Sequence, residues 1–237
     1  MKKYCNILFD LDGTLLPIDY EKFLYIYMKD LAEKFSKEGF EGKKIIQAVM
    51  KSTAAIMNND GKMTNCQAFW QNLSELTDLQ RDEIEPIFES YYENEYDAAA
   101  LPSKKNPPAE KMLLQLQRKG YRLFLATAPY FPKLAIEKRL RWAGLDSKYF
   151  EYITTYDTCC YCKPNWRYYK EILDKFHLEP EETLMVGNDA EQDTPCQKAG
   201  IDCWLITDQL INEKNLPLNS KYCSDFNSFC QKIECEF

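Results

Sequence analysis

Short apolar runs recur along the chain, and each one ends where polar or charged residues begin. The first, Tyr4–Phe9, stops directly before Asp10. Runs of this length without alternating polar positions are typical of strands buried on both faces of a parallel sheet. The other runs that we interpret as strands are Arg122–Thr127, Glu151–Thr155, Thr183–Val186 and Cys203–Ile206.

Helical patterns separate the later strands. Ala109–Lys119 carries spaced leucines and ends before Gly120, and Pro132–Ala143 ends before Gly144. Glycine directly after a periodic apolar pattern is a common helix stop. Asn165–Phe176 also places apolar side chains on one helical face. Strands that alternate with helices predict an α/β fold, a Rossmann-like, doubly wound parallel sheet with helices on both faces.

The segment 17–100, between the first and second strands, has a different pattern. It contains no clear strand but several helix-like stretches. Apolar residues recur every four positions in the first stretch: Phe23, Tyr27 and Leu31. Asp60-Gly61 interrupts the pattern, and Pro86 is expected to open another helix. The segment is therefore predicted to be an inserted, all-helical domain.

Proline marks both crossings between this insertion and the rest of the chain. Pro17 is its first residue, and the proline-rich stretch Leu101–Pro108 follows it. Such stretches are typical of linkers. We therefore expect a core formed by residues 1–16 and 101–237, and a cap formed by residues 17–100.

Composition and charge limit the classes of molecule that the protein is expected to bind. The 237-residue chain has a formal net charge of -7, which argues against a nucleic-acid polymer because phosphate backbones bind basic surfaces. No apolar run is long enough to cross a bilayer, and no signal-peptide core precedes Asp10, so we expect a cytoplasmic protein. Nothing in the pattern indicates an oligomeric state. The ten cysteines are expected to be reduced thiols, and the role of the Cys159, Cys160 and Cys162 cluster stays open.

The strongest candidate for chemistry is Asp10-Leu11-Asp12-Gly13-Thr14, directly after the first predicted strand. Ligands of open α/β sheets bind beyond the carboxyl ends of the strands. Two carboxylates separated by one residue can divide the work, one attacking phosphorus and the other moving a proton. Gly13 permits a close turn. Taken alone, the motif is also compatible with a capped turn.

With this motif, the chain resembles the haloacid dehalogenase superfamily. The later motifs of that family match Thr127, Lys163-Pro164, Gly187-Asn188-Asp189 and Asp193. Their order and spacing agree across nearly the whole chain. The resemblance implies the family's catalytic core with an α-helical cap of the type inserted after the first motif.

The resemblance also implies roles. Asp10 would be the nucleophile that forms an aspartyl-phosphate, and Asp12 the general acid and base. Mg²⁺, which prefers hard oxygen ligands, would be held by Asp10, the Asp12 carbonyl and Asp189. Because the family's spacing varies, either Asn188 or Asp189 fills the metal-ligand position; we favour Asp189, with Asp193 and Asn188 in support.

The phosphate group would be held by Thr127, Ala128 and Lys163. Taken alone, Thr127 is typical of a strand terminus and Lys163 of a solvated lysine; the family position makes both catalytic candidates. The single histidine, His177, matches no motif, and we interpret it as a helix-terminal packing residue.

These features favour a phosphatase. Dehalogenation does not need the second aspartate, whereas release of an alcohol from a phosphate ester uses it. The expected substrate is a small phosphorylated metabolite: a phosphosugar, a phosphoglycolate-like acid or a nucleoside monophosphate. Two alternatives remain, a phosphomutase of the same superfamily and a non-catalytic protein that binds a phosphorylated ligand.

Overall fold

The computed structural model describes residues 3–218 and 220–236, and its centre is a parallel sheet. Within these residues the sheet has six strands in the order β3-β2-β1-β4-β5-β6. The strands are β1 Asn6–Phe9, β2 Arg122–Leu125, β3 Tyr152–Ile153, β4 Thr183–Gly187, β5 Asp202–Ile206 and β6 Tyr222–Ser224. β1 pairs with both β2 and β4, with Phe9 opposite Leu125 and Val186. The carboxyl ends of these three strands therefore meet at one edge.

The sequence predicts five of these strands but misses β6. β1, β2 and β3 are shorter than the predicted runs, because residues at the ends of those runs, such as Thr127, lie outside the hydrogen-bonded part of the sheet. β6 is short, partly exposed and at the edge of the sheet, so it has no continuous apolar run. The predicted fold class, a parallel α/β sheet, is confirmed.

Helices cover both faces of the sheet. α5 (Pro107–Arg118) and α8 (Phe226–Glu236) pack in one hydrophobic cluster with Phe9. α7 (Arg167–Phe176) packs in a second cluster with Leu8, whose side chain points to the opposite face. The doubly wound arrangement expected from the alternating pattern is confirmed.

One further α-helix and three short 3₁₀ helices complete this part of the chain. They are α6 Lys133–Trp142, η2 Ser147–Tyr149, η3 Pro180–Glu182 and η4 Thr194–Ala199. Gly120 and Gly144 follow α5 and α6 with φ of 76° and 81°, values at which a glycine is unstrained. Both are helix stops, as predicted.

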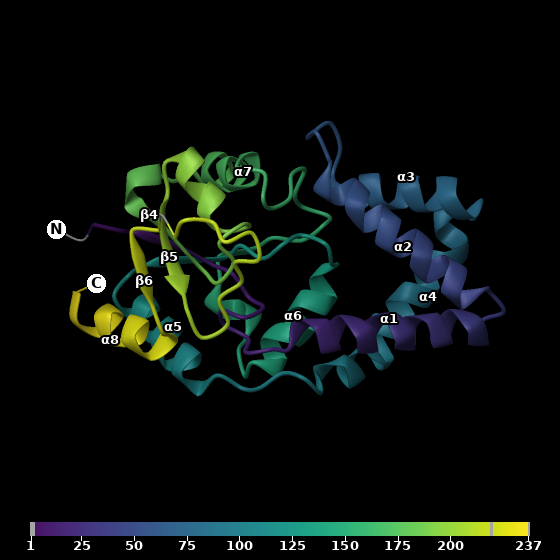
Figure 1. Cartoon of the computed structure of the whole chain (residues 1–237), viewed down its shortest axis with the longest axis horizontal. Helices are drawn as coiled ribbons and strands as arrows, with labels where there is room; N and C mark the ends of the chain where they lie inside the picture. The colour runs from purple at the N-terminus through teal and green to yellow at the C-terminus, as the bar shows by residue number, and fades with distance from the viewer. Residues whose placement is uncertain (1–2, 219, 237) are drawn as a thin grey trace.

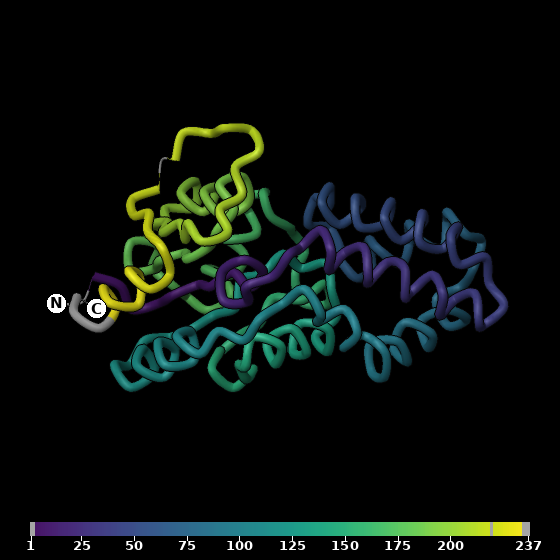
Figure 2. The backbone as a smooth tube through the Cα atoms, turned by 60° about the horizontal axis from the view of Figure 1, so that its bottom comes forward, coloured from purple at the N-terminus to yellow at the C-terminus, as the bar shows by residue number. Residues whose placement is uncertain are grey.

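Every element between β1 and α5 is a helix. These elements are α1 Tyr20–Lys37, α2 Gly42–Met57, α3 Asn65–Thr77, α4 Arg81–Asn94 and the 3₁₀ helix η1 Tyr96–Ala100. Figures 1 and 2 both show α1–α4 gathered to one side of the sheet. The prediction that Pro86 opens a helix is wrong: α4 begins at Arg81, where Gln80 and Glu83 form a capping box, and Pro86 lies inside. No helix in the described residues is both long and apolar enough to cross a membrane.

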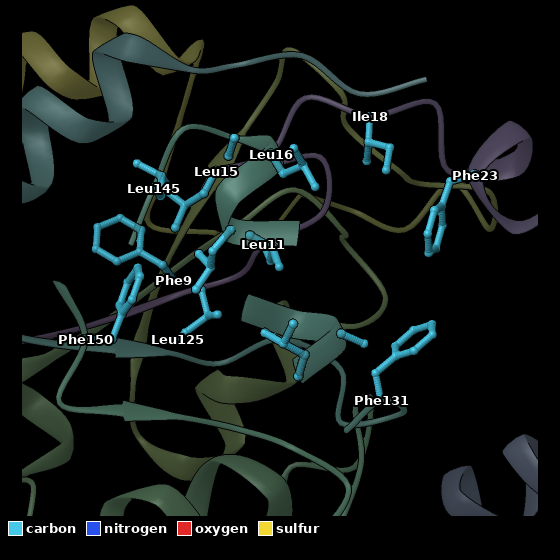
Figure 3. Close-up of a cluster of buried hydrophobic side chains, with 14 of the residues drawn as sticks. Phe9, Leu11, Leu15, Leu16, Ile18, Phe23, Leu125, Phe131, Leu145 and Phe150 are labelled. Carbon is cyan, nitrogen blue, oxygen red and sulfur yellow. The ribbon is translucent and has the colours of Figure 1, made fainter. Parts of the chain in front are cut away.

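The two crossings between these helices and the sheet run side by side. The Asp19 N–H donates to the Pro102 carbonyl at 3.1 Å, and the Lys104 N–H donates to the Pro17 carbonyl at 2.9 Å. One hydrophobic cluster continues past this point, from Phe9 through the following loop to Phe23 on α1 (Figure 3). The helical segment is thus held against the sheet by paired backbone and by shared apolar packing.

Candidate active site

The site is built around Asp10, the first residue beyond β1. Its backbone N–H donates to the Val186 carbonyl of β4 at 2.9 Å, so the carboxylate stands at the carboxyl edge of the sheet. The chain order runs from β1 outward to β2 and β3, then returns to β4 on the other side. A reversal of this kind separates the loops that follow β1 and β4 and leaves a crevice between them.

An acidic pocket of about 490 Å³ occupies that crevice. It is lined by most of the candidate residues, which are Asp10, Asp12, Lys163, Asn188, Asp189 and Asp193. Tyr20 and Glu21, at the start of α1, also line it, so the helical segment forms part of its wall. The structure therefore gathers residues that are up to 183 positions apart in the sequence, from Asp10 to Asp193.

Lys163 lies at the base of this pocket and is 1% exposed. Its Nζ donates to Asp10 Oδ1 at 2.9 Å and to Asp193 Oδ1 at 2.7 Å. Burial opposes the charged ammonium, but the two carboxylates outweigh it and raise the pKa of Lys163 above its ordinary value. The interpretation of Lys163 alone as a solvated lysine is thus wrong, because its charge is needed between two buried acids.

The pKa of Asp10 is set by opposing effects of its surroundings. Burial raises its pKa to about 7, Lys163 acts in the opposite direction, and the nearby Asp193 adds to the rise. The surroundings of Asp10 therefore disfavour its ionised form, although Lys163 partly offsets the effect of burial. The site is suited to a further positive charge beside Asp10.

The loop after β4 distinguishes Asn188 from Asp189. Asn188 is 2% exposed, and both ends of its amide are used: Oδ1 accepts from Thr14 Oγ1 at 3.0 Å, and Nδ2 donates to the Gln209 carbonyl at 2.7 Å. Asp189 Oδ1 accepts the N–H groups of Glu191 and Gln192. Asn188 is thus braced through both ends of its amide, and Asp189 is the one of the two that brings a carboxylate to the pocket.

Asp193 connects this loop to Lys163. It is fully buried, and its Oδ2 accepts the backbone N–H of Asp189 at 3.0 Å while Oδ1 accepts from Lys163. Gly187 makes room for it, because a Cβ there would lie 2.0 Å from Asp193 Oδ2. Asp193 therefore fixes the positions of both Lys163 and Asp189.

Asp12 has a partner that the sequence analysis missed. Its Oδ2 is ion-paired with Arg139 Nη1, across 127 positions of sequence. Arg139 is 1% exposed, and its guanidinium carbon lies 4.4 Å from the centre of the Phe131 ring. Asp12 Oδ1 is buried and has no hydrogen-bond partner among the described residues. A signal for Arg139 existed, since it stands four residues after Ala135, on the buried face of α6.

Thr127 and Ala128 are the candidates that do not line the acidic pocket. Thr127 is buried two residues beyond β2, and its carbonyl accepts bonds from the Thr154 and Tyr168 hydroxyls, both at 2.8 Å. β2 is the neighbour of β1, and the Ala126 N–H donates to the Phe9 carbonyl at 2.7 Å. Thr127 is thus anchored at the same sheet edge as Asp10, next to the pocket rather than in its lining.

Two other sequence features have local structural settings. His177 is the C-cap of α7, with φ of 52°, so its helix-terminal position is confirmed. Its side chain is exposed, so the packing role is wrong. In the cysteine cluster, Cys159 and Cys162 are buried, and burial raises the pKa of each thiol to about 12. Thiols of this kind are poor nucleophiles at neutral pH.

The donor set fits a hard divalent cation. The described residues contain no group of three or more His, Cys, Asp or Glu side chains placed to hold a metal. Asp10 and Asp189, however, supply two carboxylates to one pocket, which Asp12 also lines. Mg²⁺ is commonly bound by one or two carboxylates together with waters and substrate phosphate. The two carboxylates are compatible with it.

Gly13 gives a test of how tightly the site is packed. Its φ is 81°, and an added Cβ would lie 2.2 Å from Asn188 Nδ2. Gly120 has nearly the same φ, 76°, but nothing within 4 Å of an added Cβ. We expect Gly13→Ala to lower the free energy of unfolding by about 1–3 kcal/mol more than Gly120→Ala, because only the first adds a collision to the backbone strain. Urea unfolding of both variants measures the difference, and equal losses would contradict it.

The fold and the site together define a hydrolase of the α/β class whose candidate nucleophile is a carboxylate at the end of the central strand. Residues 6–200 match the family model of the haloacid dehalogenase-like hydrolases. The chain belongs to this family, and phosphatases are among its named relatives.

Individual relatives are distant. The pyrophosphatase PpaX of Bacillus mycoides (strain KBAB4) is 24% identical over 204 residues, which cover 84% of this chain and 81% of that protein. The HAD phosphatase of Thermococcus onnurineus superposes with a TM-score of 0.60 at 22% identity, covering 100% of this chain and 99% of the other. The L-2-haloacid dehalogenase of Xanthobacter autotrophicus gives 0.58 at 13% identity, covering 100% of both chains. Because both reactions occur on this fold, the chemistry must be argued from the site.

Proposed function

We propose that the chain is a magnesium-dependent phosphohydrolase that acts on a small phosphorylated metabolite through an aspartyl-phosphate on Asp10. The observation that carries the proposal is the position of Asp10, which is buried at the tip of β1, bonded to Lys163, and in one pocket with Asp189. Asp12, two residues later, supplies the acid and base that phosphate-ester cleavage requires. A PpaX-like relative is compatible with phosphate chemistry.

The proposed reaction has two balanced steps. Asp10 forms a bond to phosphorus while the bond between phosphorus and the alcohol oxygen breaks, and Asp12 gives its proton to that oxygen. Asp12 then takes a proton from a water molecule that attacks phosphorus, which frees Asp10 and inorganic phosphate. Arg139 is a positioning residue: it holds Asp12 Oδ2, so that the unpartnered Oδ1 moves the proton.

Charge neutralisation comes from several groups. Asp10, the Asp12 carbonyl and Asp189 would hold Mg²⁺, with Asn188 and Asp193 in support. The ion would supply positive charge to the transferring phosphoryl oxygens and to the Asp10 carboxylate. Lys163 adds a second cation, and Thr127 with the Ala128 amide would bind phosphoryl oxygens from the β2 side.

The cap in this proposal is the segment 17–100, and the core is formed by residues 1–16 and 101–237. Tyr20 and Glu21 already wall the acidic pocket, so the cap shapes the space for the leaving group. The two hydrogen-bonded crossings at Pro17 and Pro102 would act as its hinge. Movement there would exclude water during transfer to Asp10.

A metabolite panel tests the function. We expect phosphate release from at least one phosphosugar, phosphoglycolate-like acid, nucleoside monophosphate or simple phosphate ester. We also expect a chelator to reduce that release by at least about a hundredfold, because the remaining cations leave the phosphate dianion and Asp10 under-neutralised. Added Mg²⁺ should restore it, and phosphate release that is indifferent to the chelator would contradict the metal's role.

Product analysis separates the alternatives. A phosphomutase would convert a sugar phosphate into its isomer without stoichiometric release of phosphate. A binding protein would retain a phosphorylated ligand and turn over none of the panel. Either result would replace the phosphohydrolase proposal.

A further inference from the structure

An apolar cavity of about 220 Å³ lies between the cap helices and the segment that follows Thr127. Helices α1–α4 all contribute to it, and Tyr130, Phe131 and Pro132 form part of its core side. None of the described residues that line it carries a charge. Its walls are mainly aromatic rings and aliphatic side chains.

Several hydroxyls in these walls already have partners, whereas the buried Trp70 Nε1 has no hydrogen-bond partner among the described residues. The hydroxyls of Tyr27 and Tyr92 are hydrogen-bonded to each other at 2.7 Å. The Thr53 hydroxyl donates to the Val49 carbonyl, one turn earlier in α2, at 3.0 Å. A ligand with several hydroxyls would therefore have to compete with bonds that the Tyr27, Tyr92 and Thr53 hydroxyls already make, and the Trp70 N–H could satisfy only one acceptor.

The cavity begins beside the proposed chemistry. Tyr20 lines both the cavity and the acidic pocket. The Phe131 ring, on the core side, contacts the guanidinium of Arg139, which holds Asp12. A leaving group whose oxygen receives a proton from Asp12 can thus extend into the cavity.

The cavity adjoins an open groove on the cap surface. Leu24, Met28 and Met50 line both. Met50 is 56% exposed, and Tyr25, in the groove, is 71% exposed. Apolar surface therefore runs from the acidic pocket to solvent, with charged side chains only along the groove.

We infer that the leaving group of the substrate is apolar, so that the enzyme acts on phosphate monoesters of alcohols that carry a ring or a short hydrocarbon chain. This inference rests on the proposed function and names its substrate class. Hydroxyls of a phosphosugar, or the carboxylate of phosphoglycolate, would lose water in this cavity without gaining charged partners. An apolar cavity of about 150 Å³ holds benzene, so one of this size accommodates a substituted ring.

Two esters with similar alcohols test the inference. The alcohols of 2-phenylethyl phosphate and ethyl phosphate are leaving groups of nearly the same intrinsic reactivity, but only the first carries a ring that can occupy the cavity. We expect kcat/KM to be at least about thirtyfold higher for 2-phenylethyl phosphate, because the binding of apolar groups in a fitted pocket discriminates by about tenfold or more per small group. 2-Phosphoglycolate and glycerol phosphate should be no better than ethyl phosphate.

Cavity variants locate the preference. Val49→Phe fills the space, and Met57→Lys places a charge at a lining position that is already 48% exposed, so a folded protein is expected from at least the second. Each should reduce the preference for 2-phenylethyl phosphate by at least about tenfold and leave ethyl phosphate within about threefold. Ala54→Phe adds the same ring to the exposed side of α2 and should preserve the preference.

The possible results distinguish a failure of this inference from a failure of the proposed phosphohydrolase function. Hydrolysis of both esters with equal kcat/KM, or a preference unchanged in both cavity variants, overturns the apolar leaving group and leaves the phosphohydrolase in place. Efficient hydrolysis of glycerol phosphate or 2-phosphoglycolate, with poor use of the phenylethyl ester, does the same. If no phosphate ester is hydrolysed, the proposed function fails and the inference falls with it.

Discussion

Asp10→Asn is expected to reduce turnover by at least about a thousandfold while the protein remains folded. Asparagine has nearly the same shape as aspartate, but its amide is not an effective nucleophile toward phosphorus. The fold should tolerate the change, because burial already raises the pKa of Asp10 to about 7 and so disfavours its charge. The amide oxygen can still accept the 2.9 Å bond from Lys163.

Steady-state phosphate release, with the best ester of the panel, measures this loss, and urea unfolding measures the fold. Asp174→Asn is the matched control, because it removes the same charge from an exposed position on α7, where Asp174 is ion-paired with Lys170 in the same helix. Its turnover should stay within about twofold of the wild type. Wild-type turnover in Asp10→Asn would exclude a covalent intermediate on this residue.

Much of the sheet could be predicted from the sequence because buried parallel strands need nearly continuous apolar runs. β1, β2 and β4 are the central strands and the easiest to recognise. The motif residues follow these strands, and so their meeting at one edge is a consequence of the topology. The wrong predictions lie where the local sequence pattern is weak. The edge strand β6 was missed, and the helix that contains Pro86 starts five residues before it.

The missed residue Arg139 shows a different limit. A charged residue in a helix is usually solvated, so the position of Arg139 on the apolar face of α6 was only a weak signal of burial. Its ion pair with Asp12 joins positions 127 residues apart and exists only once α6 packs beside the loop after β1. The role of Asn188 was similarly undecidable from spacing, since its bonds to Thr14 and to the Gln209 carbonyl are long-range.

Lys163→Met is expected to lower the free energy of unfolding by about 3–5 kcal/mol and to remove turnover. The lysine neutralises Asp10 and Asp193, and it is itself almost fully buried. Removing one partner of a buried ion pair leaves the remaining charge without compensation, which costs far more than the pair itself contributes. Lys170→Met is the control, because Lys170 and Asp174 are more than half exposed and their loss should cost less than about 1 kcal/mol.

A double variant separates the lysine's contribution to stability from its proposed contribution to catalysis. Asp193→Asn in the Lys163→Met background removes one of the two uncompensated acids and should recover part of the lost stability in metal-free urea unfolding. Turnover should not return, because the cation that steadies Asp10 and the transferring phosphate is still absent. Recovery of turnover together with stability would mean that Lys163 acts only by balancing buried charge.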